Sequence, residues 1–336
     1  MNVTKKLARN VVFPALINLG LEKRWRDKSN HTILNILYHG VVEKNNLAFS
    51  PRHISCDQFI QHLKYLTREF DIISLEKAFE IYRTKQPLKR KTITVSFDDG
   101  YLNNLEVAMP LLEEFNVPTT FFISSICTQE MEIRALWTDI IACLNYFHRD
   151  EAIVIDGLDF RNMLHQPERL HLLEYLKGKS PSDRDQLVNE LIQKYDLISK
   201  IHQIPEELWK LQTGDELKKF ASSPVVTLGS HGHMHYNLGQ ISVEDATKEL
   251  KTSKALLEET TEKEINMIAY PDGSYSNEVK DIAEQLGYDM QLAVKYQCAD
   301  DVTDLRILPR FGIAVTTTYE SNMFFINKAF NTLGFN

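Results

Sequence analysis

Short apolar and β-branched runs recur along the chain, with amphipathic segments between many of them. The runs cover residues 33–38 (ILNILY), 92–97 (TITVSF), 119–124 (TTFFIS), 225–229 (VVTLG), 265–270 (INMIAY), 290–296 (MQLAVKY) and 306–313 (RILPRFGI). Helical patterns include residues 56–70, 104–116, 242–260 and 276–287. Alternation of this kind predicts an α/β protein in which helices cover parallel strands.

One long segment, residues 128–222, breaks the alternation. It is rich in helix formers and charges, and it contains one hairpin signal, Asp156-Gly157 within AIVIDGLDF. We interpret it as a mostly helical insertion, and we hypothesise that it acts as a lid or shapes a substrate site. The insertion would divide one domain into two parts, residues 31–127 and 223–336.

Composition narrows the class of protein. The 336 residues are 43% hydrophobic and 25% charged, so the chain can bury a large core. The net charge of -8 argues against a general nucleic-acid binder, because contacts to phosphates need a basic surface. The four cysteines lie far apart with no C-x-x-C pair, so neither a thiolate zinc site nor a disulfide framework is predicted.

The first 30 residues resemble a signal peptide only at first glance. Lys5, Lys6 and Arg9 precede the weakly apolar run NVVFPALINLGL, but asparagine and proline interrupt it and no small-residue cleavage site follows. We interpret residues 1–30 as a basic amphipathic helical segment that could touch a membrane surface. No run reaches the roughly 18 apolar residues of a membrane-spanning helix, and we expect a cytoplasmic protein without a transmembrane segment.

Groups able to do chemistry follow four of the strand-like runs. His39 follows the first run, Asp98 and Asp99 follow the second, three histidines follow the run that ends at 229, and Asp272 follows the run that ends at 270. In (β/α) barrels the loops at the carboxyl ends of the strands meet on one face, where the active site forms. The pattern therefore predicts that residues from distant parts of the chain share one site.

The segment SHGHMH, residues 230–235, is the densest of these groups. A lone histidine is more often structural than a ligand, but three lie here within five positions. His231 and His235 have a spacing that puts both rings on one side of a helical turn, as in H-x-x-x-H zinc motifs. The pairs that include His233 would instead suit an extended strand. The sequence alone does not choose among these pairs.

Asp98 and Asp99 are adjacent carboxylates that repel each other. In a surface turn such a pair usually marks only a solvated bend or a helix cap. Two imidazoles and one carboxylate, however, make a usual catalytic zinc site with a fourth position for water or substrate. A divalent cation bound by one aspartate would offset the repulsion and leave the other free to act on water.

Together these motifs resemble those of the polysaccharide deacetylases of the NodB-homology type, carbohydrate esterase family 4. SFDDG is similar to that family's first motif, SHGHMH to its second and, more weakly, AYPDGSY to its third. The resemblance spans roughly residues 33–125 and 224–313. It implies a distorted (β/α)7 barrel, TIM-like in kind.

The resemblance also implies roles for single residues. Asp98 would be the general base, while Asp99, His231 and His235 would bind a divalent metal, with Zn²⁺ as the first choice. His233 would then be spare and point elsewhere.

Two departures from the family pattern matter for the chemistry. Many members have an arginine in the third motif that orients the base, but Ala269 stands near that place, and we hypothesise that Arg310 substitutes. Many members also have a late histidine as the general acid, whereas no histidine follows His235. One branch, which deacetylates poly-N-acetylglucosamine, carries this histidine early in a YH segment. LYHGV matches that arrangement, so His39 is the candidate acid.

The resemblance implies a hydrolase that removes N-acetyl groups from an N-acetylated glycan. In the third motif, Pro271, Asp272 and Tyr275 are candidate substrate-binding residues, with a backbone N–H of this loop facing the oxyanion. Two alternatives stay open: a carbohydrate-binding barrel that has lost its chemistry, and an esterase or other amidase that uses the same site.

Overall fold

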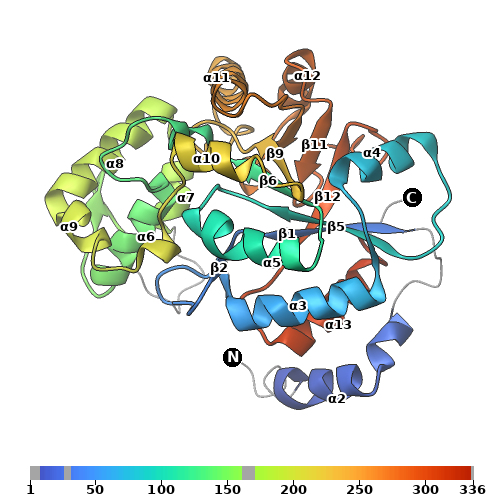
Figure 1. Cartoon of the computed structure of the whole chain (residues 1–336). Helices are drawn as coiled ribbons and strands as arrows, with labels where there is room; N and C mark the ends of the chain where they lie inside the picture. Colours follow the sequence, from blue (N-terminus) through green and yellow to red (C-terminus); the bar gives the residue numbers. More distant parts are fainter. Residues whose placement is uncertain (1–7, 26–31, 161–170, 334–336) are drawn as a thin grey trace.

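A closed barrel of parallel strands forms the centre of the computed structural model, which describes residues 8–25, 32–160 and 171–333 (Figure 1). The main sheet has eight strands in the order β1-β12-β11-β10-β9-β6-β5-β4. Because β1 also pairs with β5, the sheet closes on itself and β4 lies outside the ring. All pairs in this sheet are parallel, so every carboxyl end of the barrel strands lies at the same rim.

The elements follow in chain order. The strands of the main sheet are β1 (Ile33–Tyr38), β4 (Asp71–Ile72), β5 (Thr92–Phe97), β6 (Thr119–Ile123), β9 (Val226–Ser230), β10 (Met267–Ala269), β11 (Met290–Ala293) and β12 (Ile307–Gly312). Apart from the N-terminal segment, the α-helices described outside the insertion are α3 (Cys56–Glu69), α4 (Leu75–Thr84), α5 (Met109–Glu114), α11 (Val243–Thr261), α12 (Asn277–Gln285) and α13 (Tyr319–Ala329). A small parallel pair, β2 (Gly40–Val42) and β3 (His53–Ser55), lies outside the main sheet.

The predicted α/β barrel is confirmed by this architecture. All seven strand-like runs of the sequence are barrel strands, and β1 and β5 match their predicted bounds to the residue. The predicted helix at 104–116 is split, because a π-helical turn at Asn104–Ala108 precedes α5. The helices α4 and α13 were not singled out from the sequence.

Local sequence signals explain several element ends. The hydroxyl of Ser242 accepts a hydrogen bond from the Asp245 amide at the start of α11, as its S-x-x-D spacing predicts. Gly287 follows α12 at φ +85°, a left-handed conformation that favours glycine. These caps fix one end each of α11, which packs against β9, and of α12, which packs against α11.

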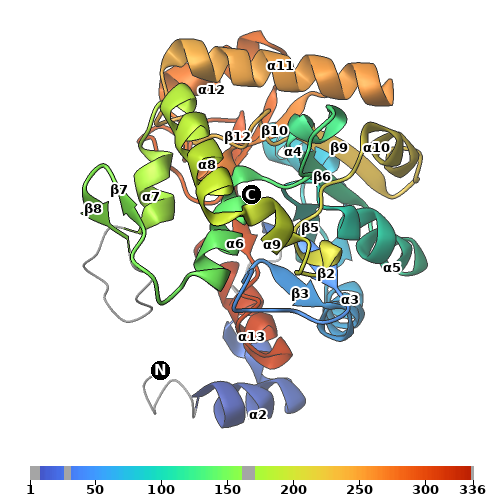
Figure 2. The same cartoon turned by 90° about the vertical axis from the view of Figure 1, so that its left-hand side faces the viewer.

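The segment 128–222 contains five α-helices and one hairpin within its described residues. They are α6 (Trp137–Phe147), β7 (Val154–Ile155), β8 (Leu158–Asp159), α7 (Leu172–Lys177), α8 (Pro181–Tyr195), α9 (Leu197–Ile201) and α10 (Gly214–Phe220). The predicted hairpin turns at Asp156 and Gly157, both at positive φ. Helices α6 to α9 gather on one side of the barrel (left in Figure 1), and Figure 2 views this side directly.

The N-terminal segment packs as short helical turns against α13 (Figure 1). The turns are a π-helix (Ala8–Val12), α2 (Phe13–Asn18) and a 3₁₀-helix (Leu21–Trp25). Phe13 stacks on Phe324 with ring centroids 4.5 Å apart, while Val11 and Leu19 are exposed. Lys5 and Lys6 lie outside the described residues. Among the residues that are described, no helix is long and apolar enough to cross a membrane.

A buried lysine ties the loop before β12 to α12. The ammonium of Lys280 lies 2.5 Å from Asp301 and 3.1 Å from Asp304, and its side chain is fully buried. Cys298, Asp300 and Asp301 also lie close enough together to hold a cation. The lysine charge already occupies this acidic cluster, so the cluster is explained by structure alone.

We predict that Lys280→Met lowers the free energy of unfolding by about 3–5 kcal/mol, because it leaves the buried carboxylate of Asp301 without its cation, whereas Asp304 keeps its ion pair with Arg306. Lys218 is the matched control, since it forms a lysine–carboxylate pair with Glu262 in which both side chains are mostly exposed. Lys218→Met should cost no more than about 1 kcal/mol. Equal denaturant midpoints for the two variants would contradict the prediction.

Candidate functional site

A pocket of about 660 Å³ opens at the carboxyl ends of the barrel strands. Its floor includes His39 after β1, the Asp98 and Asp99 pair after β5, and His231 and His235 after β9. One wall comes from the insertion, through α6 and α7, and another comes from the segment that precedes β3. The predicted meeting of distant polar groups at one rim is therefore observed.

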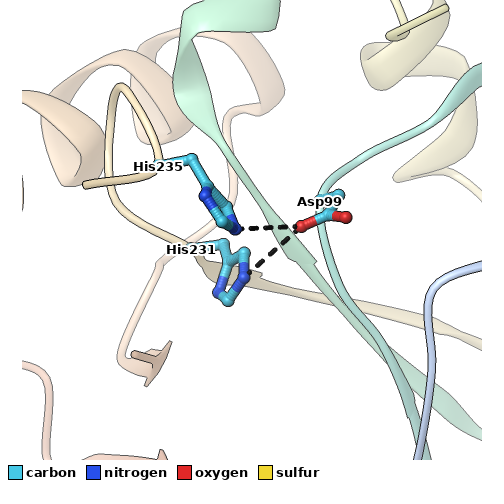
Figure 3. A group of neighbouring side chains, drawn as sticks. All are labelled: Asp99, His231 and His235. Atoms are coloured by element: carbon cyan, nitrogen blue, oxygen red, sulfur yellow. Dashed lines mark ion pairs between the residues drawn. The ribbon is translucent and has the colours of Figure 1, made fainter. Parts of the chain in front are cut away.

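Asp99, His231 and His235 converge at the bottom of this pocket (Figure 3). Oδ1 of Asp99 lies 3.3 Å from Nε2 of His235 and 3.5 Å from Nε2 of His231. The candidate ligand atoms all lie within 4.8 Å of one another, and all three residues are buried. Of the pairs left open by the sequence, the structure thus brings His231 and His235 to the aspartate.

His231 and His235 lie close together although they are not on a helical turn. Residues 231–235 form an irregular loop after β9, with Gly232 at φ +74° and His235 at φ +56°. The left-handed backbone at His235 turns the chain back so that its ring meets that of His231, with centroids 4.9 Å apart. The helical explanation of the i, i+4 spacing is therefore wrong, although the pair itself lies at the site.

Hydrogen bonds orient the histidines of this loop differently. Nδ1 of His231 lies 2.7 Å from the carbonyl oxygen of Ala269, so this nitrogen carries the proton and Nε2 keeps its lone pair for a metal. Nδ1 of His233 instead pairs with the hydroxyl of Ser125 at 2.9 Å. His233 therefore turns away from Asp99.

The residues present fit a divalent metal. Both carboxylate oxygens of Asp99 are buried, and neither accepts a hydrogen bond from the described part of the chain. A buried carboxylate without partners is costly, and a bound cation removes that cost. Two imidazole nitrogens and one carboxylate oxygen are the donor set of a catalytic zinc site.

Asp98 has a different environment from its neighbour. The guanidinium of Arg310 forms a bidentate ion pair with it, with N–O distances of 2.6 and 2.8 Å. Arg310 projects from β12 and is buried, with its guanidinium 5.3 Å from the centroid of the Phe122 ring. The strand register pairs Arg310 with Asn35 of β1, one strand away from β5. The structure thus brings Arg310 to Asp98.

Burial and charge act in opposite directions on both carboxylates. Burial acts to raise the pKa of Asp98, but the charge and hydrogen bonds of Arg310, together with the charges of His231 and His39, outweigh it and hold this pKa below its usual value. Burial also acts to raise the pKa of Asp99, but His235, together with the charges of His39 and His231, outweighs it, so this pKa lies well below its usual value. Both groups are therefore carboxylates at neutral pH.

His39 lines the same pocket as the two aspartates. Asn104 donates a hydrogen bond to its backbone carbonyl at 3.2 Å. The next residue must be small, because a Cβ on Gly40 would lie 2.3 Å from Nδ1 of His53. Burial lowers the pKa of His39, and the charges of Asp99 and Asp98 offset part of this shift.

Of the three candidate substrate-binding residues in the third motif, Asp272 alone lines the pocket. It forms an ion pair with Lys177 of the insertion at 2.9 Å. Pro271 is not among the lining residues. The buried Tyr275 is not among them either, because its hydroxyl donates to Asp301 at 2.5 Å and its ring stacks on Tyr270. The stacked partner, Tyr270, does reach the pocket.

Two charged residues at the pocket were missed in the sequence. Arg52 precedes β3, and its Nη1 lies 3.9 Å from Oδ2 of Asp99. Lys177 comes from α7. Neither belongs to a motif or follows a barrel strand, so no local signal in the sequence distinguishes them from surface cations.

Comparisons with known proteins point in the same direction as this geometry. A family model for polysaccharide deacetylase matches residues 85–141 and 178–291. YxkH of Bacillus subtilis (strain 168), whose name places it with the polysaccharide deacetylases, is 19% identical over 256 residues, which cover 76% of this chain and 62% of YxkH. This chain thus spans about three fifths of that relative.

Solved structures share the fold. The Streptococcus pyogenes deacetylase PplD in complex with acetate superposes with a TM-score of 0.57 at 17% identity, over 91% of this chain and 99% of PplD. IcaB from Ammonifex degensii gives 0.56 at 15% identity, over 90% of this chain and 99% of IcaB. The barrel, the buried Asp-His-His group and the matching family model together define the class of protein. The chain belongs to the polysaccharide deacetylase family.

We predict that Asp99→Ala and His235→Ala each weaken Zn²⁺ binding by more than the about 10–100-fold typical of losing an outer-shell partner, because each removes a direct ligand. Titration of the metal-free chain with Zn²⁺ against a chromophoric chelator measures this. His233→Ala is the matched control from the same loop and should bind Zn²⁺ as the unaltered chain does. Equal weakening in all three variants would contradict the ligand set.

Proposed function

We propose that this chain is a metal-dependent hydrolase that removes acetyl groups from the amide nitrogen of an N-acetylated sugar. The observation that carries the proposal is the split between the adjacent aspartates. Asp99 faces the two histidine Nε2 atoms, whereas Asp98, with Oδ2 3.7 Å from Nε2 of His231, is held by Arg310. A carboxylate that lies beside the proposed metal ligands, and is held by an arginine instead of the metal, is suited to act as a general base.

The residues Asp99, His231 and His235 would hold the metal, for which we propose Zn²⁺. When bound, such an ion supplies Lewis-acid chemistry, activating water and polarising the amide carbonyl. Asp98 accepts the proton of the attacking water. Its lowered pKa keeps it ionised, and Arg310 keeps both of its oxygens in a fixed plane.

His39 is proposed to protonate the amine as acetate leaves. Its lowered pKa makes the imidazolium a stronger acid than an ordinary histidine, and only part of the population is protonated at neutral pH. The position of His39 in the same pocket, ahead of the Asp-Asp motif in sequence, supports assignment to the branch with an early catalytic histidine.

The substrate would enter between the barrel rim and the insertion. PplD is described as a deacetylase in complex with acetate, the product expected here. The pocket volume lies within the about 300–1,000 Å³ usual for small-ligand sites, which suits one or a few sugar units at a time. Asp272, held by Lys177, offers a carboxylate oxygen to sugar hydroxyls at the rim.

We predict that Asp98→Asn lowers the rate of acetate release from N-acetylated glucosamine oligosaccharides by about 10²- to 10⁴-fold while Zn²⁺ affinity is kept. The amide cannot accept the proton, but the three proposed ligands are unchanged. Acetate is assayed on the Zn²⁺-loaded chain.

Two outcomes separate the proposal from its rivals. Turnover by Asp98→Asn at the rate of the unaltered chain would show that another group is the base. An unaltered chain that binds Zn²⁺ and oligosaccharide but releases no acetate would be a binding protein, and acetate release from O-acetyl sugars alone would make it an esterase.

The pH profile tests His39. A general acid must be protonated, so kcat/KM should fall as pH rises through the pKa of His39, and ionisation of Asp98 should limit the rate only at acid pH. His39→Gln should lower the rate by about 10²- to 10⁴-fold and remove the alkaline fall. His233→Gln is the control and should keep the profile of the unaltered chain. An alkaline fall retained in His39→Gln would assign the acid elsewhere.

A further inference from the structure

The first turn of α6 touches both sides of the candidate metal centre. Its three residues, Trp137, Thr138 and Asp139, are buried and consecutive. Trp137 faces the loop that carries the histidines, and Asp139 faces the surroundings of Asp99. This turn belongs to the insertion and supplies none of the proposed ligands or catalytic groups.

Trp137 holds the backbone of one proposed ligand. Its indole N–H donates to the carbonyl oxygen of His235 at 3.2 Å, a buried hydrogen bond. The φ of +56° at His235 is unfavourable for a residue with a Cβ and persists only where neighbours enforce it. The bond from Trp137 is such a constraint, because it fixes the peptide that sets the direction of the His235 ring.

A buried arginine keeps this indole in place. The guanidinium of Arg184, from α8, lies 5.1 Å from the Trp137 ring centroid and 4.1 Å from that of Tyr236, the residue after His235. The hydroxyl of Tyr236 donates to Asp185 at 2.7 Å. The histidine loop is thus bound to two helices of the insertion.

Asp139 acts on the other side of the centre. It forms a short ion pair with Arg52 and accepts a hydrogen bond from the Tyr101 hydroxyl at 3.0 Å. Thr138 adds a hydrogen bond, accepting from Arg52 Nη1 at 3.3 Å. The same Nη1 is only 3.9 Å from Oδ2 of Asp99. A guanidinium released from Asp139 could therefore pair with Asp99 and compete with a cation.

We infer that the first turn of α6 is a positioning element of the candidate metal centre, in which Trp137 fixes the backbone of His235 and Asp139 holds Arg52 so that its guanidinium makes no hydrogen bond to Asp99. The inference rests on the metal centre of the proposed function but not on its substrate. It makes the insertion a part of the metal site's support and not only a wall of the pocket.

Two tryptophans of the insertion provide a matched test. Trp209 is buried like Trp137, and its indole N–H donates at 3.1 Å to the carbonyl oxygen of Ile204, which is not part of the histidine loop. Trp137→Phe and Trp209→Phe each remove one buried N–H donor and should lower thermal stability to a similar degree. Only Trp137→Phe should weaken Zn²⁺ binding, by about 10–100-fold.

A double-mutant cycle tests the Asp139 side with the same Zn²⁺ titration. Asp139→Asn should weaken Zn²⁺ binding by about tenfold or more. Arg52→Met should change the affinity little when Asp139 is present, and should restore most of it in the Asp139→Asn background. A purely long-range effect of charge would instead be additive, so the coupling separates the two accounts.

The outcomes are distinct. Zn²⁺ affinity unchanged in a folded Trp137→Phe, or weakened equally in Trp209→Phe, overturns the role of Trp137, and an additive cycle overturns that of Asp139. If Trp137→Phe does not fold, Trp137→His, whose ring can donate from Nε2, is measured instead and should keep more affinity than Trp137→Leu. A chain that binds Zn²⁺ as inferred but releases no acetate contradicts the proposed function alone.

Discussion

Two adjacent, buried carboxylates at the end of β5 are the constraint on which the rest of the site depends. Asp98 and Asp99 repel each other, and neither carboxylate can be left buried without a compensating charge. The backbone separates them, because Asp99 adopts a φ of +80° and its side chain leaves in another direction from that of its neighbour. Each carboxylate then has its own partners: Arg310 for Asp98, and two imidazoles for Asp99. Closure of the barrel makes this division possible, since β12 and β9 approach β5 from opposite sides through β1 and β6.

The division of charge also supports the proposed chemistry. A guanidinium with two parallel hydrogen bonds fixes the plane of Asp98 and leaves it ionised, whereas Asp99 is left with oxygens that only a cation or a proton can satisfy. The second cation nearby, Arg52, would be the natural partner of Asp99 if nothing else held it. Asp139 and Arg310 therefore have similar electrostatic roles. Arg310 neutralises the charge of Asp98, and Asp139 neutralises the charge of Arg52, which leaves Asp99 available for the proposed metal.

Much of the fold was predictable because its signals are local. Continuous apolar runs identified every barrel strand, and polar residues directly after them marked the rim. His231 and His235 were singled out by spacing, yet the reason was wrong, since a left-handed residue and not a helical turn joins them. The contact of Arg310 with Asp98 depends on strand order around the barrel, which no local pattern contains, and it was reached only through a resemblance. Arg52 and Trp137 belong to no sequence motif. Their contacts at the site could not be predicted, because they depend on tertiary contacts made by the insertion.

The place of the insertion in the chain explains why it reaches the metal centre. It leaves the barrel after β6 and returns at β9, two strands that pair directly. β6 also pairs with β5, so the insertion begins beside the strand that carries Asp99 and ends before the strand that precedes His231. A parallel connection must leave from the carboxyl rim, which here is also the rim of the pocket. An insertion that leaves from this rim begins next to the site. Its first α-helix contacts both sides of the candidate metal centre, through Trp137 and Asp139.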